Sequence, residues 1–174
     1  LYRLDPPIRD EHGKEIKYLY PTGERMQFDI HPRSARDIDD PNIPLYIVEG
    51  AKKGDTLVSH GRCVIALHGV DCWRGTNTKG GKTALAAWHD IALNGRQCTI
   101  IYDSDVATKP TVKRAMDELA AYLTSKKAQV RLAYLPSPDG QKVGVDDYLL
   151  THTLADLEAL IVAPPAKPSP PPQE

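Results

Sequence analysis

Residues 97–105 have the sequence Gln-Cys-Thr-Ile-Ile-Tyr-Asp-Ser-Asp, an apolar run that ends abruptly in two carboxylates. A short, uninterrupted apolar run is typical of a strand that is buried on both faces of a parallel sheet. A second run, 45–48, ends in the same manner in Glu49 and Gly50. Two further apolar runs, 63–67 and 129–135, complete a set of four predicted strands.

The segments between these strands are predicted to be mainly helical. The expected helices are 51–60, 83–93, 110–126, 146–150 and 153–162. An alternation of strands and helices is typical of a parallel sheet that has helices on both faces. The sequence therefore predicts an α/β fold, with a mostly parallel, Rossmann-like sheet of four strands.

We divide the chain into three parts by composition. Residues 1–43 are polar and are predicted to form a small β-rich N-terminal extension, in which 16–20 and 26–30 pair as a hairpin. Residues 44–162 form the expected α/β domain. Residues 163–174 are mostly proline and are predicted to be an extended linker or tail.

The overall composition restricts the class of protein. The 174 residues include 22 Lys and Arg and 23 Asp and Glu, and this balance argues against a uniformly basic nucleic-acid clamp. Three cysteines without a CxxC pair favour a reducing, cytoplasmic setting. No apolar run approaches the ~20 residues of a membrane span, so we expect no membrane partner. Because the chain begins on Leu1, we expect it to be a piece of a larger protein.

Three carboxylates follow the predicted strands, at the sheet edge where α/β proteins bind ligands. Asp103 and Asp105 are two residues apart, so along an extended segment they face the same way, ~6.6 Å from each other. Glu49 joins them if the two strands are neighbours. At ~5 Å and an effective dielectric constant of ~20, each pair repels by about 3 kcal/mol. A hard divalent cation, Mg²⁺ or Mn²⁺, would relieve that repulsion.

Three motifs together resemble the Toprim domain, the catalytic module of bacterial-type primases, topoisomerases and certain nucleases. They are Ile-Val-Glu-Gly at 47–50, Ile-Ala-Leu-His-Gly-Val at 65–70 and Ile-Tyr-Asp-Ser-Asp at 101–105. The resemblance covers about residues 44–150. It is strongest to the Toprim-like domains of phage and plasmid replication proteins, which share stretches similar to 69–73, 102–115 and 135–149.

The resemblance implies roles for individual residues. Glu49 corresponds to the glutamate that is proposed as general acid or base, and Asp103 and Asp105 correspond to metal ligands. Asp146 and Asp147 resemble a later acidic motif near the same site. From the residues alone, Asp146 and Asp147 have an alternative role, because they precede a short apolar segment and would also suit a helix cap.

The implied function is metal-dependent phosphoryl transfer on nucleic acid, with primase-type primer synthesis as the first interpretation. The expected partners are a single-stranded DNA template, nucleoside triphosphates and a replicative helicase, in a mobile-element protein of bacterial, archaeal, phage or plasmid origin. A nuclease with the same ligand set and a non-catalytic module that binds DNA or a partner protein are the alternatives. The chain departs from bacterial primases at 106–109, where a glycine is common, and it shows no zinc ribbon.

Several basic residues are predicted to contact phosphates as point charges. They are Lys52, Lys53, Arg74, Lys82 and Lys109. Lys82 follows a glycine pair that does not have P-loop spacing but would bind phosphate through its N–H groups if it led into a helix.

Two other features have structural interpretations that are at least as strong. Trp73 would stack on a base or pack in the core, and Trp88 is expected in the core. His68, Cys72 and His89 fit no standard zinc-ligand spacing, so a zinc site is not expected.

Overall fold

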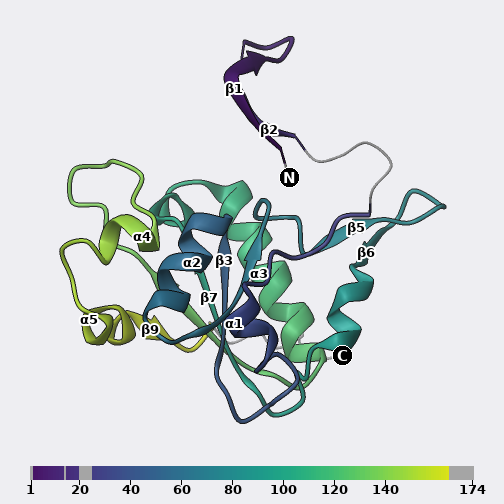
Figure 1. Cartoon of the computed structure of the whole chain (residues 1–174), viewed down its shortest axis with the longest axis vertical. Coiled ribbons are helices and arrows are strands. Elements are labelled where there is room, and N and C mark those ends of the chain that lie inside the picture. Colours follow the sequence, from purple (N-terminus) through teal and green to yellow (C-terminus); the bar gives the residue numbers. More distant parts are fainter. Residues whose placement is uncertain (1, 14, 20–24, 165–174) are drawn as a thin grey trace, which may run out of the picture.

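A five-stranded sheet organises the chain in the computed structural model, which describes residues 2–13, 15–19 and 25–164 (Figure 1). Its strands, in spatial order, are β4 (Cys63–Leu67), β3 (Leu45–Glu49), β7 (Gln97–Tyr102), β8 (Gln129–Tyr134) and β9 (Ile161–Val162). The first four are parallel, whereas β9 runs antiparallel to β8. The four predicted strands are confirmed, but the expected strand count is wrong by one, since β9 lies in a segment predicted as helix.

Helices cover both faces of this sheet, as expected for an α/β fold. The long helix α3 (Pro110–Ser125) packs on one face, and α2 (Ala51–Ser59), α4 (Val145–Tyr148) and α5 (Leu154–Ala159) pack on the other. The side chains of β3 alternate between the two layers, with Leu45 and Ile47 toward α3. This alternation follows from the two-residue period of a strand.

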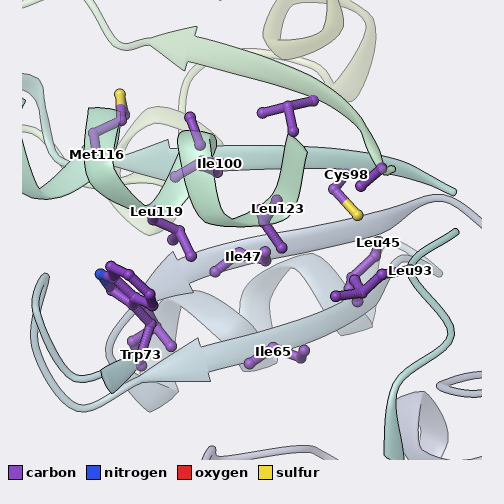
Figure 2. Close-up of a cluster of buried hydrophobic side chains, with 14 of the residues drawn as sticks. Leu45, Ile47, Ile65, Trp73, Leu93, Cys98, Ile100, Met116, Leu119 and Leu123 are labelled. Atoms are coloured by element: carbon purple, nitrogen blue, oxygen red, sulfur yellow. The ribbon is translucent and has the colours of Figure 1, made fainter. Parts of the chain in front are cut away.

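The layer between the sheet and α3 fixes the strand positions. The residues that meet there are almost completely buried, and burying one Leu or Ile side chain contributes about 1.5–3 kcal/mol. Helix α3 places its apolar residues three or four positions apart, on one face. In Figure 2 the sheet supplies Leu45, Ile47, Ile65 and Ile100, and α3 supplies Met116, Leu119 and Leu123.

The predicted helix at 83–93 is wrong. Strands β5 (Arg74–Thr76) and β6 (Lys82–Ala84) form a hairpin, and only a short 3₁₀ helix, η1 (Ala86–Asp90), follows. The Asn77 side chain accepts hydrogen bonds from the N–H groups of Lys79 and Gly81, and Gly80 has a φ of 80°, which favours glycine. The glycine pair therefore closes a tight turn, and the expectation of a phosphate-binding loop that leads into a helix is wrong as well.

The N-terminal pairing also differs from the prediction. Strand β1 (Tyr2–Arg9) pairs with β2 (Glu15–Leu19), so β2 does not pair with 26–30. Asp29 instead exchanges two backbone hydrogen bonds with Ala66, at the outer edge of β4. Helix α1 (Pro32–Ala35) follows, and the Ser34 hydroxyl accepts a hydrogen bond from the Val64 N–H. Residues 20–24 and most of the predicted linker, 165–174, lie outside the described residues.

The segment before β3 is held by a completely buried arginine, Arg96. Its Nε donates to the Ile43 carbonyl at 2.7 Å, and its two Nη atoms donate to the carbonyls of Ile38 at 2.5 Å and Asp37 at 2.9 Å. One Nη also lies 3.5 Å from Cys63 Sγ. Backbone carbonyls thus satisfy this guanidinium, and in return it fixes the path of residues 37–43 into the sheet.

Smaller differences concern the helix ends. Helix α4 begins at Val145 and ends at Tyr148, and α5 ends at Ala159, where β9 begins to pair with β8. Immediately after β7 the chain turns into the 3₁₀ helix η2 (Ser104–Ala107). Within the residues described, no helix has the length and apolar character needed to cross a bilayer.

Candidate functional site

Glu49 and Asp103 come together at one edge of the sheet, as predicted. They follow Val48 of β3 and Tyr102 of β7, and these two parallel strands are direct neighbours. Both carboxylates line a cavity of about 510 Å³, which we call the first cavity. Its other lining residues are Met26, Gly50, Ala51, Lys52, Lys53, His68, Cys72, Lys142 and Asp146.

The turn after Glu49 explains why glycine follows it. Gly50 has a φ of 93°, a conformation that costs other residues about 1–2 kcal/mol, and its N–H donates to the Leu67 carbonyl at 2.7 Å. Helix α2 begins at the next residue. A β-carbon on Gly54 would lie 3.0 Å from that of Ala66, so this second glycine lets α2 pack closely on β4. The tight turn places Lys53 over the end of β7.

Asp103 is 3 % exposed and contacts two ammonium groups. Lys53 Nζ lies 3.2 Å from Oδ1, and Lys142 Nζ lies 2.8 Å from Oδ2. Despite the nearby Lys53, Oδ1 has no aligned hydrogen-bond donor among the described residues. This oxygen is therefore held only by the ion pair with Lys53, and it would become a coordination position for a metal cation that displaced this lysine.

Asp105 stays close to Asp103, since both carboxylates contact Lys142 Nζ, but it does not line the first cavity. The reason is that η2 begins at Ser104, and the segment is not extended there. Asp105 instead lines a second cavity of about 480 Å³. Its Oδ2 lies 2.8 Å from Lys109 Nζ and 3.6 Å from Lys142 Nζ. The second cavity is lined by Ser104, Asp105, Ala107, Thr108, Lys109, Leu135, Pro136, Ser137, Gly140, Gln141 and Lys142.

Lys142 joins the two cavities, and sequence reasoning assigned it no role. It reaches both Asp103 and Asp105 because Ser104, between them, holds the neighbouring backbone. The Ser104 N–H donates to the Val143 carbonyl at 2.9 Å, and the Val143 N–H donates to Ser104 Oγ at 2.8 Å. The sequence holds one signal that could have revealed this role: Lys142 lies four residues before Asp146, within the stretch 135–149 that resembles Toprim-like domains.

The two carboxylates at the start of α4 have different surroundings. Asp146 lines the first cavity, where its Oδ2 lies 3.0 Å from Lys52 Nζ, and its Oδ1 has no hydrogen-bond donor among the described residues. Asp147 is exposed, and its Oδ2 accepts a hydrogen bond from the Gly144 N–H at 3.2 Å. The helix-cap alternative therefore describes Asp147, whereas Asp146 faces the site.

Gly144 is the point at which these groups converge. A β-carbon built on it would lie 2.5 Å from Asp146 Oδ1, 2.5 Å from Lys53 Cε and 3.2 Å from Asp103 Oδ1. Its φ of −93° suits any residue, so the need for glycine here is a matter of space. Only a residue without a side chain lets Asp103 and Asp146 approach each other in this way.

Gly144→Ala is therefore expected to separate the two carboxylates and to weaken Mn²⁺ binding by about tenfold or more, the range seen when groups that orient metal ligands are changed. Calorimetric titration with Mn²⁺ measures the effect. The matched control is Gly75→Ala, whose β-carbon would make an ordinary 3.5 Å contact with Leu85. Equal affinities for the two variants would show that Gly144 does not set this geometry.

The charges in the first cavity shift two pKa values. Burial raises the pKa of Glu49, the nearby charges of Asp103 and Asp105 raise it further, and Lys142 and Lys53 only partly oppose this. Burial lowers the pKa of Lys142, but its hydrogen bond to Asp103 and the surrounding carboxylates outweigh that effect and raise it. Lys142 thus stays cationic, and the raised pKa of Glu49 suits a group that exchanges protons.

The raised pKa of Glu49 has a consequence for stability without metal. Ionising Glu49 costs the folded state more than the unfolded state, so stability is lost as the pH rises from the usual glutamate pKa, about 4.3, through the raised value. In EDTA at pH 7, Glu49→Gln should therefore unfold at a higher temperature than the wild type, and the difference should vanish below pH ~4. Glu11→Gln, at an exposed position, is the control. A lower unfolding temperature for Glu49→Gln would contradict the assignment.

The predicted phosphate-binding residues fall into three places. Lys52 and Lys53 line the first cavity, and Lys109 lines the second. Arg74 and Lys82 lie on the β5–β6 hairpin beside a third cavity of about 400 Å³. There Arg74 is paired with Asp71 at 2.7 Å and with Glu118 at 2.5 Å, and Lys82 Nζ donates to Thr76 Oγ1. Arg74 also lies over the ring of Trp73, which is buried in the core, as is Trp88.

The donor atoms in the first cavity suit a hard divalent cation. Among the described residues, no three His, Cys, Asp or Glu side chains are gathered as a ready metal cluster. Ammonium groups stand between the carboxylates instead. The donor-free oxygens of Asp103 and Asp146 nevertheless lie on the same side of Gly144, and oxygen ligands are those that Mg²⁺ and Mn²⁺ prefer. The residues therefore fit such an ion once it displaces the lysine ammonium groups from the carboxylates.

Comparison with known proteins identified one family. A family model described as a domain of unknown function (DUF3854) matches residues 36–155. The matched stretch contains every carboxylate and lysine of both cavities. No curated protein and no solved structure matched the chain.

Proposed function

The chain belongs to the DUF3854 family, and from its site we propose that it carries out metal-dependent phosphoryl transfer on nucleic acid. The observation that carries this proposal is the first cavity, which is lined by Glu49 and Asp103 at the carboxyl ends of neighbouring parallel strands and by Asp146 at the start of α4. One oxygen of Asp103 and one of Asp146 accept no aligned hydrogen bond from the part of the chain that the structure describes, and lysines surround them. Carboxylates that bind a metal, together with cations that bind phosphate, are the groups that this chemistry needs.

Each residue has a part in the proposed reaction. Asp103 and Asp146 would hold Mg²⁺ or Mn²⁺, with Asp105 and Glu49 beside them, and the bound ion would supply Lewis-acid stabilisation of the phosphoryl oxygens. Glu49 would accept the proton of the attacking hydroxyl, a role that its raised pKa favours. Lys52, Lys53 and Lys109 would bind phosphate groups. Asp147 remains a helix cap in this scheme.

Primer synthesis is the first candidate reaction. It is supported by the resemblance to Toprim-like domains of mobile-element replication proteins, which applies to Glu49, Asp103 and the acids at the start of α4. The substrates would be a single-stranded DNA template and nucleoside triphosphates, and the domain would act beside a replicative helicase. The attacking group would be a 3′-hydroxyl. In a nuclease of the same ligand set, water would take its place.

A single incubation distinguishes these reactions. The chain is mixed with a labelled single-stranded template, ribonucleotides and Mn²⁺, and the products are separated on a denaturing gel. New short strands that require ribonucleotides are the expected result. Template cleavage without new strands would replace the primase proposal with the nuclease, and the absence of both products would leave the non-catalytic alternative.

A further inference from the structure

We propose that Lys142 is a tethered cation that a divalent metal displaces from the first cavity, and that the second cavity then binds a phosphate group through Lys142 and Lys109. This inference rests on the proposed function, because it assumes that a metal binds to Asp103. It goes beyond that function by assigning a phosphate site to the second cavity and by coupling this site to the metal.

The position of Lys142 is that of an internal counter-ion. Its Nζ lies 2.8 Å from Asp103 and 3.6 Å from Asp105, so one ammonium group neutralises a carboxylate of each cavity. The Asp103 side chain is almost completely buried, whereas the Lys142 side chain is 51 % exposed. A lysine with a half-exposed stem can leave its partners without opening the core.

The backbone beside Lys142 is fixed, so only its side chain needs to move. Val143 is bound to Ser104 by two hydrogen bonds, and Ser137 Oγ donates to the Gln141 carbonyl at 2.5 Å. The Ser104 contacts hold the backbone after Lys142 against the end of β7, and the Ser137 contact closes the loop before it. Rotation of an exposed lysine side chain takes picoseconds to nanoseconds, so it would not slow the binding of metal.

Charge balance explains why the movement would create a phosphate site. Without metal, Lys53, Lys109 and Lys142 offset Glu49, Asp103 and Asp105, so an anion gains little from these lysines. A divalent cation on the carboxylates replaces the lysines as counter-charge. The freed ammonium groups then need a new anion, and a phosphate group can interact with the metal site and the lysines together.

The second cavity has the lining that a phosphate-bearing ligand needs. Lys109 and Lys142 supply two cations, and both are paired with the Asp105 carboxylate of the same cavity until that carboxylate is balanced otherwise. The hydroxyl groups of Thr108 and Ser137 also line it, although each donates to a backbone carbonyl. Its volume of about 480 Å³ is in the range of small-molecule sites. Leu135 and Pro136 add an apolar wall, against which the organic part of such a ligand could pack.

The proposal requires that metal and phosphate strengthen each other's binding. Such coupling is reciprocal, and factors of about 5–150 are typical. It is measured by calorimetric titration of Mg²⁺ into the chain, with and without inorganic phosphate and with free Mg²⁺ corrected for its complex with phosphate. We expect phosphate to raise the affinity of the wild type for Mg²⁺ by at least about fivefold.

Lys142→Met gives two opposite changes that a merely structural role would not produce. Without phosphate, its affinity for Mg²⁺ should rise by up to about fivefold, because the competing ion pair is gone. With phosphate, the coupling factor should fall toward one. Lys142→Arg should retain both the competition and the coupling. Lys113→Met, on the outer face of α3 and paired with Asp117, is the control and should behave as the wild type.

The outcomes separate this inference from the proposed function. If the wild type binds Mg²⁺ but Lys142→Met changes neither value, or lowers both, the tethered-cation proposal is wrong and the metal site stands. If the wild type binds no Mg²⁺, the proposed function and this inference both fail.

Discussion

Asp103→Asn should reduce the proposed metal-dependent phosphoryl transfer by at least about 100-fold, the scale seen when one group that stabilises transition-state charge is removed. Asp103 is the most buried carboxylate of the site and contacts both Lys53 and Lys142. An amide keeps the shape of the side chain but removes its charge, so it holds a divalent cation more weakly and cannot balance those lysines. The rate of product formation in Mn²⁺, on the template described above, measures the loss.

Asp147→Asn is the matched control for this variant. Asp147 lies in the same sequence motif as Asp146, but it caps α4 and is exposed, so an amide oxygen can still accept the Gly144 hydrogen bond. We expect its activity to stay within about threefold of the wild type. Replacing a charged helix cap by a neutral one lowers the stability of the fold by less than ~1 kcal/mol, so the site should keep its shape. Circular dichroism would verify that both variants are folded. Equal activity of Asp103→Asn and Asp147→Asn would contradict the assignment of Asp103.

Arg96→Met should lower the free energy of unfolding by about 3–5 kcal/mol, a large share of the 5–15 kcal/mol of a typical domain. Methionine fills much of the volume but donates no hydrogen bonds. The carbonyls of Asp37, Ile38 and Ile43 would then lose their donor, and each unsatisfied buried group costs about 1–3 kcal/mol. Urea unfolding followed by circular dichroism measures the difference.

The control is Arg131→Met, at an exposed position on β8. It should change the free energy of unfolding by less than about 0.5 kcal/mol, as surface substitutions do. If the free energy of unfolding of Arg96→Met also stayed within that margin of the wild-type value, the buried guanidinium would not be what holds residues 37–43.

The sheet was predictable because its strands are short apolar runs that are buried on both faces, and periodicity detects these directly. The structure of the segment at 83–93 could not be predicted in this way. The Asn77 side chain closes a tight turn, and this turn allows Arg74–Thr76 to pair with Lys82–Ala84. Helical spacing of apolar residues could not reveal that competing turn. Arg96 was also missed, because an arginine that is satisfied by carbonyls looks like a surface arginine in sequence.

The site was predictable where it depends on strand ends and not where it depends on contacts between distant segments. Glu49 and Asp103 meet because β3 and β7 are neighbours. Lys142 reaches Asp103 only because Ser104 binds Val143, a contact across 39 residues. Asp146 and Asp147 are adjacent in sequence, and only the start of α4 decides which of them faces the cavity. Asp105 lines the second cavity because η2 begins before it.

The proposed function requires that the carboxylates at the ends of β3 and β7 bind a divalent metal ion. Calorimetric titration of Mn²⁺ into the wild type and into Asp103→Asn, without nucleic acid or nucleotide, tests it most directly. We expect saturable binding by the wild type and at least about tenfold weaker binding by Asp103→Asn. Absence of binding by the wild type, or equal binding by both proteins, would contradict it.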